Sequence, residues 1–431
     1  MKKYYVFICD FCIECNKFKN VLYSGKGKIL IFMVFSTFRR VNFLKLASRM
    51  SILPSSGTIG MLELARRMEK EGKTVIHLEV GEPDFDTPSH IKDAAVKALE
   101  EGLVKYTESK GIPELRSAIA SWIREKSGCE VDVEEVIVTP GAKHAIFCAI
   151  LALLEPGDEV IIPSPVWPTY KDIARFAGGI PREVPLSRDY SLDEEAVKEA
   201  ISEKTKMIIL NSPNNPTGGV ISRDEMKAVV DLAVDHGFYI MSDEIYDGLT
   251  YDGFRQTSIL SFEDARGISV LIHGFSKSYA MTGWRVGYAV ASRELVNAMS
   301  KIQQNTTTCA ASFVQKAALE ALRGPQDCVE EMRREYDRRR RALVKALNEI
   351  DGVYCPTPKG AFYVFPDLSA YVEDSVAFAE ELLKEEGVCV TPGKVFGLGG
   401  EGHVRISYAA SMKSILEGVE KIREFLSSMR R

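Results

Sequence analysis

Short apolar runs and longer amphipathic stretches alternate along most of the chain. Between about residues 92 and 320, apolar runs typical of buried strands, such as those at 135–139, 158–162 and 270–272, are separated by stretches with the periodicity of helices. This alternation predicts a largely parallel sheet that is covered by helices on both faces. In such folds ligands bind beyond the carboxyl ends of the strands, so polar residues that directly follow a strand are the first candidates for a site.

The two ends of the chain have a different pattern. Before the alternating region, residues 61–71 read as a helix and residues 75–80 as a strand. After it, a charged helix at about 327–349 leads into short strands and further helices, which predicts a smaller α+β unit. We therefore expect four segments: an N-terminal extension at 1–45, an arm with the first part of a small domain at 46–91, a large domain at 92–324 and the remainder of the small domain at 325–431.

A single lysine follows the strand at 270–272, in a turn that is otherwise poor in charge. Burial disfavours the charged form of a lysine, so Lys277 should have a lowered pKa and a nucleophilic amine, which can form Schiff bases with carbonyl compounds. Arg285 stands at the start of a second apolar run, at 284–291, that reads as a strand. An unpaired cation there is costly, and a phosphate would pair with it. The alternative is a surface loop in which Lys277 is solvated and Arg285 forms an ordinary ion pair.

Polar residues also follow two other predicted strands. Asn215 lies in a turn rich in Pro, Asn and Gly after one apolar run, and Asp243 ends another, with Tyr246 three residues later. Because strands of a parallel sheet end at the same edge, Asn215, Asp243 and Lys277 should converge although they are far apart in the sequence.

A glycine turn at residues 140–143 opens a long apolar helix. Such a turn presents unpaired backbone N–H groups and the positive end of the helix dipole, which suits a phosphate. The backbone of Ala142 and Lys143 is therefore a candidate phosphate site. The alternative is that the turn only connects a strand to a helix.

Three motifs occur in the order NNPTG at 214–218, SDEIY at 242–246 and SKSYAMTGWRVGY at 276–288. Together they resemble the pyridoxal-phosphate-dependent aminotransferases of class I and II, most of all the branch of bacterial and archaeal aspartate and aromatic aminotransferases. The resemblance extends from about Leu46 to the C-terminus. It implies fold type I of the pyridoxal-phosphate-dependent transferases, an α/β fold with a mostly parallel seven-stranded sheet in the large domain and a smaller α+β domain.

The same resemblance implies the reaction and the cofactor. The cofactor would be pyridoxal 5'-phosphate. An amino group would pass by ping-pong chemistry between an L-amino acid (aspartate, aromatic or aliphatic) and a 2-oxo acid such as 2-oxoglutarate. A carbon–sulfur lyase or a related eliminating enzyme is the alternative function, because such enzymes share the fold and the residues that bind the cofactor.

The residues at the strand ends receive roles from this resemblance. Lys277 would bind the cofactor covalently and then act at the substrate as general base and general acid. Asp243 would keep the pyridine nitrogen protonated, so that the ring accepts electrons. Asn215 and the Tyr246 hydroxyl would hydrogen-bond to the phenolic oxygen of the cofactor.

The phosphate and ring of the cofactor have further matching residues. Arg285 and the turn at Ala142 and Lys143 would anchor the phosphate, and Trp167 would lie over the pyridine ring and next to the substrate. The resemblance also implies a homodimer with shared active sites, in which the Tyr106 hydroxyl reaches the phosphate bound by the neighbouring subunit.

Three further residues match the part of the family's site that binds the substrate. The backbone of Gly81 would lie beside the substrate, and Asn215 also borders it. Arg405 would bind the α-carboxylate with a bidentate pair of hydrogen bonds, which the planar guanidinium favours.

The chain departs from some relatives at two places. Where they carry a serine three residues before the lysine as a phosphate ligand, this chain has Gly274, which leaves Ser276 or Ser278 as an open substitute. Some aspartate-selective relatives have a basic residue on the helix after the phosphate turn, whereas here we expect an apolar face with Phe147 and Leu151. This face predicts a broad range of amino donors.

Composition narrows the class of protein further. With 45% hydrophobic and 27% charged residues, the 431-residue chain is typical of a globular protein, and no apolar run approaches the ~18 residues that span a bilayer. The net charge of −5, without a basic stripe or a helix-turn-helix pattern, argues against nucleic-acid binding and against a transcriptional regulator. The six histidines lack ligand spacing, so we predict no metal site.

The first 45 residues differ in composition from the rest of the chain, because they are rich in Lys, Phe, Tyr, Ile and Asn. Cys9, Cys12 and Cys15 form a CxxCxxC motif, which can begin a metal site, but no fourth cysteine follows at a suitable spacing. We expect a disordered or non-native extension, which arises from translation at an upstream start, rather than a metal site or a targeting peptide. The other six cysteines are scattered, as expected for a protein of the reducing cytoplasm.

Overall fold

The computed structural model describes residues 20–23, 29–32, 46–53 and 57–429. By its contacts the chain divides into two units, Met1–Met50 and Ser51–Arg431. In the first unit, strands β1 (Asn20–Tyr23) and β2 (Ile29–Phe32) form an antiparallel pair. The CxxCxxC motif lies outside the described residues, as does most of the predicted extension, so the expectations for both stay predictions.

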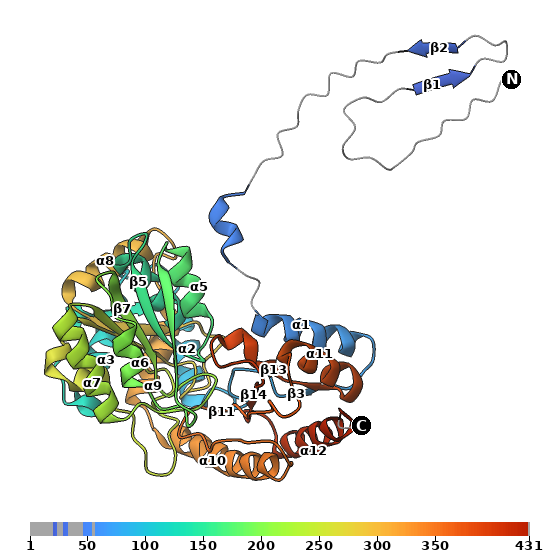
Figure 1. Cartoon of the computed structure of the whole chain (residues 1–431). Helices are drawn as coiled ribbons and strands as arrows, with labels where there is room; N and C mark the ends of the chain where they lie inside the picture. The colour runs from blue at the N-terminus through green and yellow to red at the C-terminus, as the bar shows by residue number, and fades with distance from the viewer. Residues whose placement is uncertain (1–19, 24–28, 33–45, 54–56, 430–431) are drawn as a thin grey trace. The chain divides into compact units, whose positions relative to one another are not determined.

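A seven-stranded sheet forms the centre of the unit Ser51–Arg431 (Figure 1). In spatial order its strands are β4 (Val136–Thr139), β10 (Gly287–Ala291), β9 (Ser269–Gly274), β8 (Tyr239–Asp243), β7 (Thr205–Asn211), β5 (Glu159–Ser164) and β6 (Ile180–Pro185). All strands run in one direction except β10, which is antiparallel to both of its neighbours. The predicted mostly parallel seven-stranded sheet is therefore confirmed.

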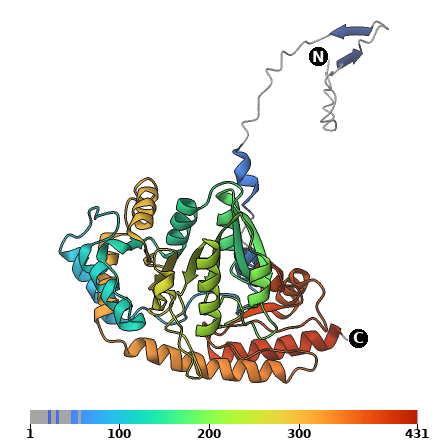
Figure 2. The same ribbon diagram turned by 60° about the vertical axis from the view of Figure 1, so that its left-hand side comes forward.

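Both faces of this sheet are buried along β4, β8, β9 and β10, which explains why these strands are rich in apolar residues, whereas the edge strand β6 is largely exposed. Alternate residues contribute to two separate cores; for example, Ile208 belongs to one and Ile209 to the other. The first core also contains residues of α2 (Ser89–Glu100), α3 (Pro113–Ser127), α6 (Glu194–Glu199), α7 (Arg223–His236) and α9 (Ser312–Arg323). The second contains residues of α4 (Ala142–Leu153), α5 (Thr169–Phe176) and α8 (Arg293–Gln304). Figure 2 shows helices packed around the sheet.

A third core joins residues from both ends of the unit Ser51–Arg431. Its helices are α1 (Gly57–Lys70), α10 (Asp327–Asn348), α11 (Ser375–Glu386) and α12 (Met412–Met429). Strands β11 (Tyr363–Val364) and β14 (Val404–Ser407) contribute to this core and form one sheet with β13 (Thr391–Pro392). Strand β3 (Ile76–His77) pairs in parallel with β12 (Val388–Cys389), which also contributes to the core. Because the contacts place Ser51–Arg431 in one compact unit, the domain boundaries at residues 91 and 324 stay predictions.

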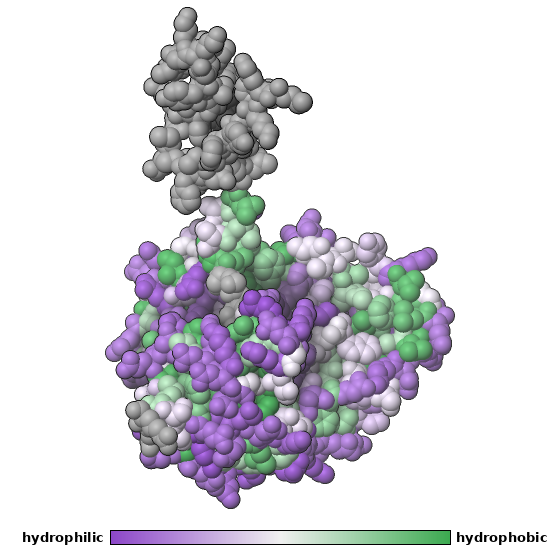
Figure 3. Space-filling view, turned by 90° about the vertical axis from the view of Figure 1, so that its right-hand side faces the viewer, coloured by the Kyte–Doolittle hydropathy of each residue, from purple (hydrophilic) through white to green (hydrophobic). Residues whose placement is uncertain are grey.

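Short 3-10 helices complete the described elements: η1 (Ser48–Ser51), η2 (Val133–Glu135), η3 (Ile259–Ser261), η4 (Glu263–Ala265) and η5 (Gly393–Phe396). On the face shown in Figure 3, hydrophilic residues prevail and hydrophobic ones gather in separate patches. Among the described residues, no helix is both long and apolar enough to cross a membrane. The same residues contain no group of three or more His, Cys, Asp or Glu side chains arranged to hold a metal ion.

The strand predicted at 284–291 begins later than expected. It starts at Gly287, because Arg285 has a left-handed backbone (φ 56°) that a strand does not accommodate. Glycine at 287 allows a close approach: a Cβ there would lie 2.4 Å from the backbone nitrogen of Ala142. The start of β10 therefore lies directly against the turn that opens α4.

Two neighbouring arginines on α10 contact the same two acids. The Arg340 side chain has no exposed surface, and its guanidinium lies 2.7 Å from Asp252 and 2.5 Å from Asp337 and donates to the carbonyl of Pro358. The Arg341 side chain is 60% exposed and pairs with the same two carboxylates. The two arginines thus differ in burial rather than in the acids that they contact.

Arg340→Ala should lower the free energy of unfolding by about 3 kcal/mol, because it removes the buried member of an ion-pair network. Arg341→Ala should lower it by only about 0–1 kcal/mol, because exposed ion pairs contribute little. Urea unfolding of both variants and of the unsubstituted protein measures the difference. Equal losses would show that burial does not decide the contribution of these arginines.

Candidate active site

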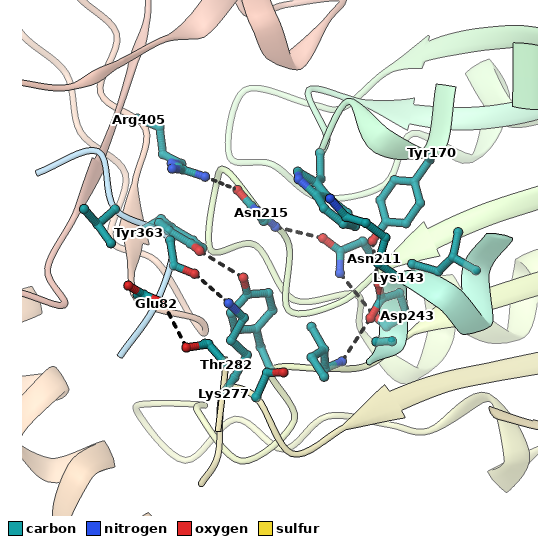
Figure 4. A pocket seen from close by; sticks show the side chains of 18 of the residues that line it. Glu82, Lys143, Tyr170, Asn211, Asn215, Asp243, Lys277, Thr282, Tyr363 and Arg405 are labelled. Carbon is teal, nitrogen blue, oxygen red and sulfur yellow. Dashed lines mark hydrogen bonds between the residues drawn. The ribbon is translucent and has the colours of Figure 1, made fainter. Parts of the chain in front are cut away.

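A cavity of about 550 Å³ lies at the carboxyl ends of the central strands (Figure 4). Ten of the residues predicted from the sequence line it: Gly81, Ala142, Lys143, Trp167, Asn215, Asp243, Tyr246, Lys277, Arg285 and Arg405. They come from the end of β8 and the turn after it, from the segments after β3, β5, β7 and β9, from the start of α4 and from β14, so the fold unites segments far apart in the sequence. Tyr106 is not among them; it is 85% exposed.

Lys277 lies half-buried in the turn that follows β9. Its Nζ atom donates a 2.6 Å hydrogen bond to the carbonyl oxygen of Gly81. Burial, together with the nearby guanidinium of Arg405, lowers the pKa of Lys277 to about 8, with the Arg285 cation contributing in the same direction. A substantial share of this amine is therefore neutral and nucleophilic near neutral pH.

Asp243 is the last residue of β8, and its carboxylate is buried. The hydroxyl of Tyr170 donates to Oδ2 over 2.7 Å, and the backbone N–H of Ile245 donates to Oδ1 over 3.2 Å. Asn211, its register partner on β7, donates to its backbone carbonyl. Burial raises the pKa of Asp243. Within the described part of the chain Asp243 has no ion-pair partner, so a cationic group in the cavity would stabilise its charged form.

Arg405, on β14, is 3% exposed and is held by neutral groups. One terminal nitrogen donates to the side-chain oxygen of Asn215 over 3.0 Å, and the other donates to the Glu79 carbonyl and the Thr391 hydroxyl. The ring of Tyr363 lies 4.5 Å from the guanidinium carbon. The ion pairs among the described residues do not include Arg405. Its buried charge is therefore suited to an anion such as a carboxylate.

Asn215 and Tyr246 are both buried at the cavity wall. The oxygen of the Asn215 side chain accepts from Arg405, so the end that can donate into the cavity is Nδ2. The hydroxyl of Tyr246 lies 2.9 Å from the hydroxyl of Tyr363. Two donors from different elements thus border the same space.

The turn before α4 lies against Arg285. Gly141 has φ 83°, and a Cβ there would lie 2.5 Å from the guanidinium of Arg285. Arg285 donates to the carbonyl of Thr282 over 2.7 Å. Lys143, the second residue of α4, places Nζ 4.7 Å from the ring centre of Trp167, and burial and the Arg285 cation lower its pKa. A helix N-terminus beside two cations is a favourable anion site.

The structure separates the two serines that the sequence left open. Ser276 lines the cavity beside Lys277, whereas Ser278 lines a different cavity. A side chain at Gly274, the position where some relatives have serine, would lie within 3.0 Å of the backbone of Gly287. The close pairing of β9 and β10 therefore disfavours a side chain at 274, and Ser276 is the serine of this turn that lines the cavity.

The apolar helix face predicted at Phe147 and Leu151 is wrong as a wall of this cavity. The residues of α4 that line it are Ala142, Lys143 and Ile146, which share one face at helical spacing. Phe147 points elsewhere and packs against Phe176. The helix is rotated relative to the expectation. The side chain of Lys143, for which only a backbone role was predicted, therefore borders the cavity.

Sequence reasoning also missed four lining residues that shape the chemistry: Tyr170, Asn211, Thr282 and Tyr363. For Asn211 a signal existed, because it ends β7 as Asp243 ends β8. Tyr170 and Tyr363 carried no such signal, since a tyrosine on a helix or a short strand is ordinarily part of a core. Both have buried hydroxyls that contact predicted residues, Asp243 and Tyr246.

Comparison with known proteins gives consistent matches over this region. The family described as "Aminotransferase class I and II" matches residues 73–422. The chain is 42% identical over 392 residues to a probable aspartate/prephenate aminotransferase of Aquifex aeolicus, covering 89% of this chain and 99% of that protein. It is also 42% identical over 383 residues to the (5-formylfuran-3-yl)methyl phosphate transaminase of Methanocaldococcus jannaschii, covering 89% of this chain and 100% of that protein.

Among solved structures, an aspartate aminotransferase of Thermus thermophilus with maleate matches with a TM-score of 0.84 and 41% identity, covering 88% of this chain and 99% of that chain. This agreement confirms the predicted fold class. Relatives of equal identity carry different substrate names, so identity alone does not choose the substrate.

The lowered pKa of Lys277 predicts the pH dependence of its reactivity. In protein freed of carbonyl compounds, acetylation of Lys277 by acetic anhydride should rise with pH through a midpoint near 8, against 10.5 for an ordinary lysine. Arg405→Met should move the midpoint upward, because removal of a nearby cation favours the charged amine. Peptide mass spectrometry across a pH series measures both midpoints. A midpoint above 10 in the unsubstituted protein would contradict the assignment.

Proposed function

Because this chain belongs to the aminotransferase class I and II family, and is an aminotransferase as its motifs predict, we propose that its cavity binds pyridoxal 5'-phosphate on Lys277 and uses an acidic amino acid such as aspartate as donor. The observation that carries the proposal is the set of charges in the cavity. Four cationic side chains line it among the described residues: Lys143, Lys277, Arg285 and Arg405. Lys277 would bind the carbonyl group of the cofactor, and Arg285 would bind its phosphate. Arg405 and Lys143 would bind the two carboxylates of the substrate.

The residues present fit the cofactor. Asp243 is a buried carboxylate without a cationic partner in the described chain, which suits a protonated pyridine nitrogen. Arg285 and the N-terminus of α4 suit the phosphate. Ser276, beside Lys277 in the cavity, is the proposed hydroxyl ligand of that phosphate.

When bound, pyridoxal phosphate supplies an electron sink for the negative charge that forms at the substrate Cα. With its lowered pKa, the amine of Lys277 would be the group that accepts the proton from the substrate Cα and later returns it as general acid. Asp243 keeps the proton on the pyridine nitrogen, and Tyr170 holds the carboxylate in place. The Asn215 amide, whose oxygen is held by Arg405, and the Tyr246 hydroxyl, which lies 2.9 Å from that of Tyr363, would donate to the phenolic oxygen.

Arg405 orients the substrate. Its guanidinium lies between Asn215 and the Glu79 carbonyl, and the ring of Tyr363 packs against it, so it is fixed before the substrate arrives. A planar α-carboxylate accepts two parallel hydrogen bonds from such a group. Gly81 leaves room beside it, because a Cβ there would lie 3.0 Å from the Tyr363 hydroxyl.

Lys143 is the cation that remains for the substrate side chain. Arg405 takes the α-carboxylate and Arg285 the phosphate, whereas Lys143 has no ion pair within the described part of the chain. Its ammonium, over the Trp167 ring, would bind a second carboxylate. The aspartate aminotransferase names of several relatives support this choice of donor.

We also propose a homodimer, in which Tyr106 acts at the neighbouring cofactor. Its side chain is 85% exposed. A groove of about 630 Å³, lined by Arg285 and by apolar residues that include Trp284 and Phe313, opens next to the proposed phosphate site. A second copy of the chain would cover both Tyr106 and this groove. The six cysteines of the described residues are free thiols, which supports the reducing cytoplasm as its compartment.

The half-reaction tests amino transfer against the carbon–sulfur lyase alternative. Enzyme loaded with pyridoxal phosphate and mixed with aspartate alone should release one equivalent of oxaloacetate per subunit and no ammonia, because the amino group stays on the protein. Addition of 2-oxoglutarate should then yield glutamate. Rapid-quench analysis of the oxo acid and an ammonia assay measure both products. Continuous release of ammonia without an acceptor would identify an eliminating enzyme instead.

Lys143→Met should lower kcat/KM for aspartate about ten- to a hundredfold, because a hydrogen bond to a charged group contributes about 1.5–3 kcal/mol. Phenylalanine, which lacks the second carboxylate, is the internal control, and its kcat/KM should stay the same or rise. Steady-state kinetics with both donors measures the ratio. An equal loss for the two donors would show that Lys143 acts on the cofactor rather than on the side chain of the substrate.

Tyr106→Phe should weaken binding of pyridoxal phosphate about ten- to a hundredfold, since it removes a hydroxyl that donates to a charged phosphate. Hybrids of Tyr106→Phe and Lys277→Ala subunits should contain one site with both native residues, and that site should hold the cofactor as tightly as the unsubstituted enzyme. Equilibrium dialysis measures the affinities. A fully active monomer in sedimentation would overturn the shared site.

A further inference from the structure

A second cavity, of about 260 Å³, lies behind the catalytic turn. None of its lining residues lines the first cavity. Alternate parts of one turn face the two spaces: Ser276 and Lys277 line the first cavity, whereas Phe275 and Ser278 line the second. The two cavities are therefore separated by the turn that carries the catalytic lysine.

Ser278 brings an unpaired hydroxyl to this second cavity. The residue is 5% exposed, and its Oγ atom has no hydrogen-bond partner among the described residues. It points toward Gly248, which also lines the cavity, since a Cβ on Gly248 would lie 2.8 Å from that oxygen. A buried hydroxyl without a partner is costly, so a polar group inside the cavity would stabilise it.

Two opposite charges border the same cavity. Lys126 lies with its ammonium 5.0 Å from the centre of the Trp122 ring, and it belongs to no ion pair of the described residues. Asp247 accepts from Nε2 of His273 over 2.9 Å. The imidazole outweighs the effect of burial and lowers the pKa of Asp247, so Asp247 keeps its negative charge, and one of its two oxygens has no contact with His273.

The carboxylate of Glu330, which also lines the cavity, already has cationic partners. Both oxygens of Glu330 accept hydrogen bonds from arginines, Arg333 and Arg334. The remaining wall is largely apolar and aromatic, with Phe275, Leu322 and Val329 among its residues. The cavity thus offers one cation, one anion, a hydroxyl and an apolar wall.

We propose that this second cavity binds a free α-amino acid with an apolar side chain. The ligand's ammonium meets Asp247, its carboxylate meets Lys126 and the Ser278 hydroxyl, and its side chain packs on the wall at Leu322 and Val329. A single charge of either sign would leave one of the two protein charges unmatched, whereas a zwitterion matches both. The volume lies below the roughly 300–1,000 Å³ of sites for drug-sized molecules, which agrees with so small a ligand.

Such a site is placed to influence the reaction. Ser278 follows Lys277 directly, and Asp247 follows Tyr246, so an occupant contacts the segments that hold the catalytic groups. The ligand belongs to the same chemical class as the donors of the enzyme. An amino acid bound in the second cavity would therefore contact these segments without entering the catalytic cavity.

The experiment counts bound phenylalanine in cofactor-loaded, full-length enzyme by equilibrium dialysis with radiolabelled L-phenylalanine. Arg405→Met is the background, because it weakens binding in the first cavity and leaves the second intact. We expect one phenylalanine to remain per subunit. In this background Lys126→Met should weaken that binding about ten- to a hundredfold, and Ser278→Ala should weaken it as well.

Arg124→Met is the matched control, since Arg124 lies on the same helix, is likewise exposed, and does not line the cavity. It should leave phenylalanine binding unchanged. Lys126→Met alone should retain the amino-transfer rate in the absence of added phenylalanine, which shows that it folds. Absence of bound phenylalanine in the Arg405→Met background overturns the proposal. So does binding that Lys126→Met leaves unchanged, or a crystal structure grown with phenylalanine that shows only water in the second cavity.

Discussion

Lys277 is half-buried in a cavity that also contains two guanidinium groups, and its amine donates a 2.6 Å hydrogen bond to the carbonyl of Gly81. Burial of the amine, together with the repulsion of the Arg405 and Arg285 cations, lowers its pKa to about 8. The guanidinium groups keep their charge at every accessible pH and remain available for anions. Lys277 can instead lose its proton at moderate pH, and its neutral amine is then available as a base and a nucleophile.

The two arginines hold their positions without an acid. Arg405 donates to the Asn215 side chain and to the Glu79 carbonyl, and Arg285 donates to the Thr282 carbonyl. Neutral acceptors fix the direction of a guanidinium but leave its charge uncompensated, so a carboxylate or phosphate gains the full attraction on binding. The fold supplies these acceptors from loops and short strands around the end of the sheet, which is why the site needs both parts of the unit Ser51–Arg431.

Three site residues that follow strands were predictable from the sequence: Asn215, Asp243 and Lys277. The reason is topological, since strands that run in parallel end at one edge whatever their separation in the chain. The direction of a side chain from a helix was harder to predict: Ile146 borders the cavity and Phe147, the next residue along the helix, does not. Tyr170 and Tyr363 were missed because their roles depend on tertiary contacts, a hydroxyl on Asp243 and another on Tyr246, that no local pattern records.

The central claim is that the amine of Lys277 moves the proton at the substrate Cα. Exchange of the α-hydrogen of aspartate with deuterated water, followed by NMR on enzyme loaded with pyridoxal phosphate, tests it most directly. We expect exchange with the unsubstituted enzyme, its loss by several orders of magnitude in Lys277→Ala, and partial recovery when a small primary amine is added to that variant. Exchange in Lys277→Ala at the unsubstituted rate would contradict the account.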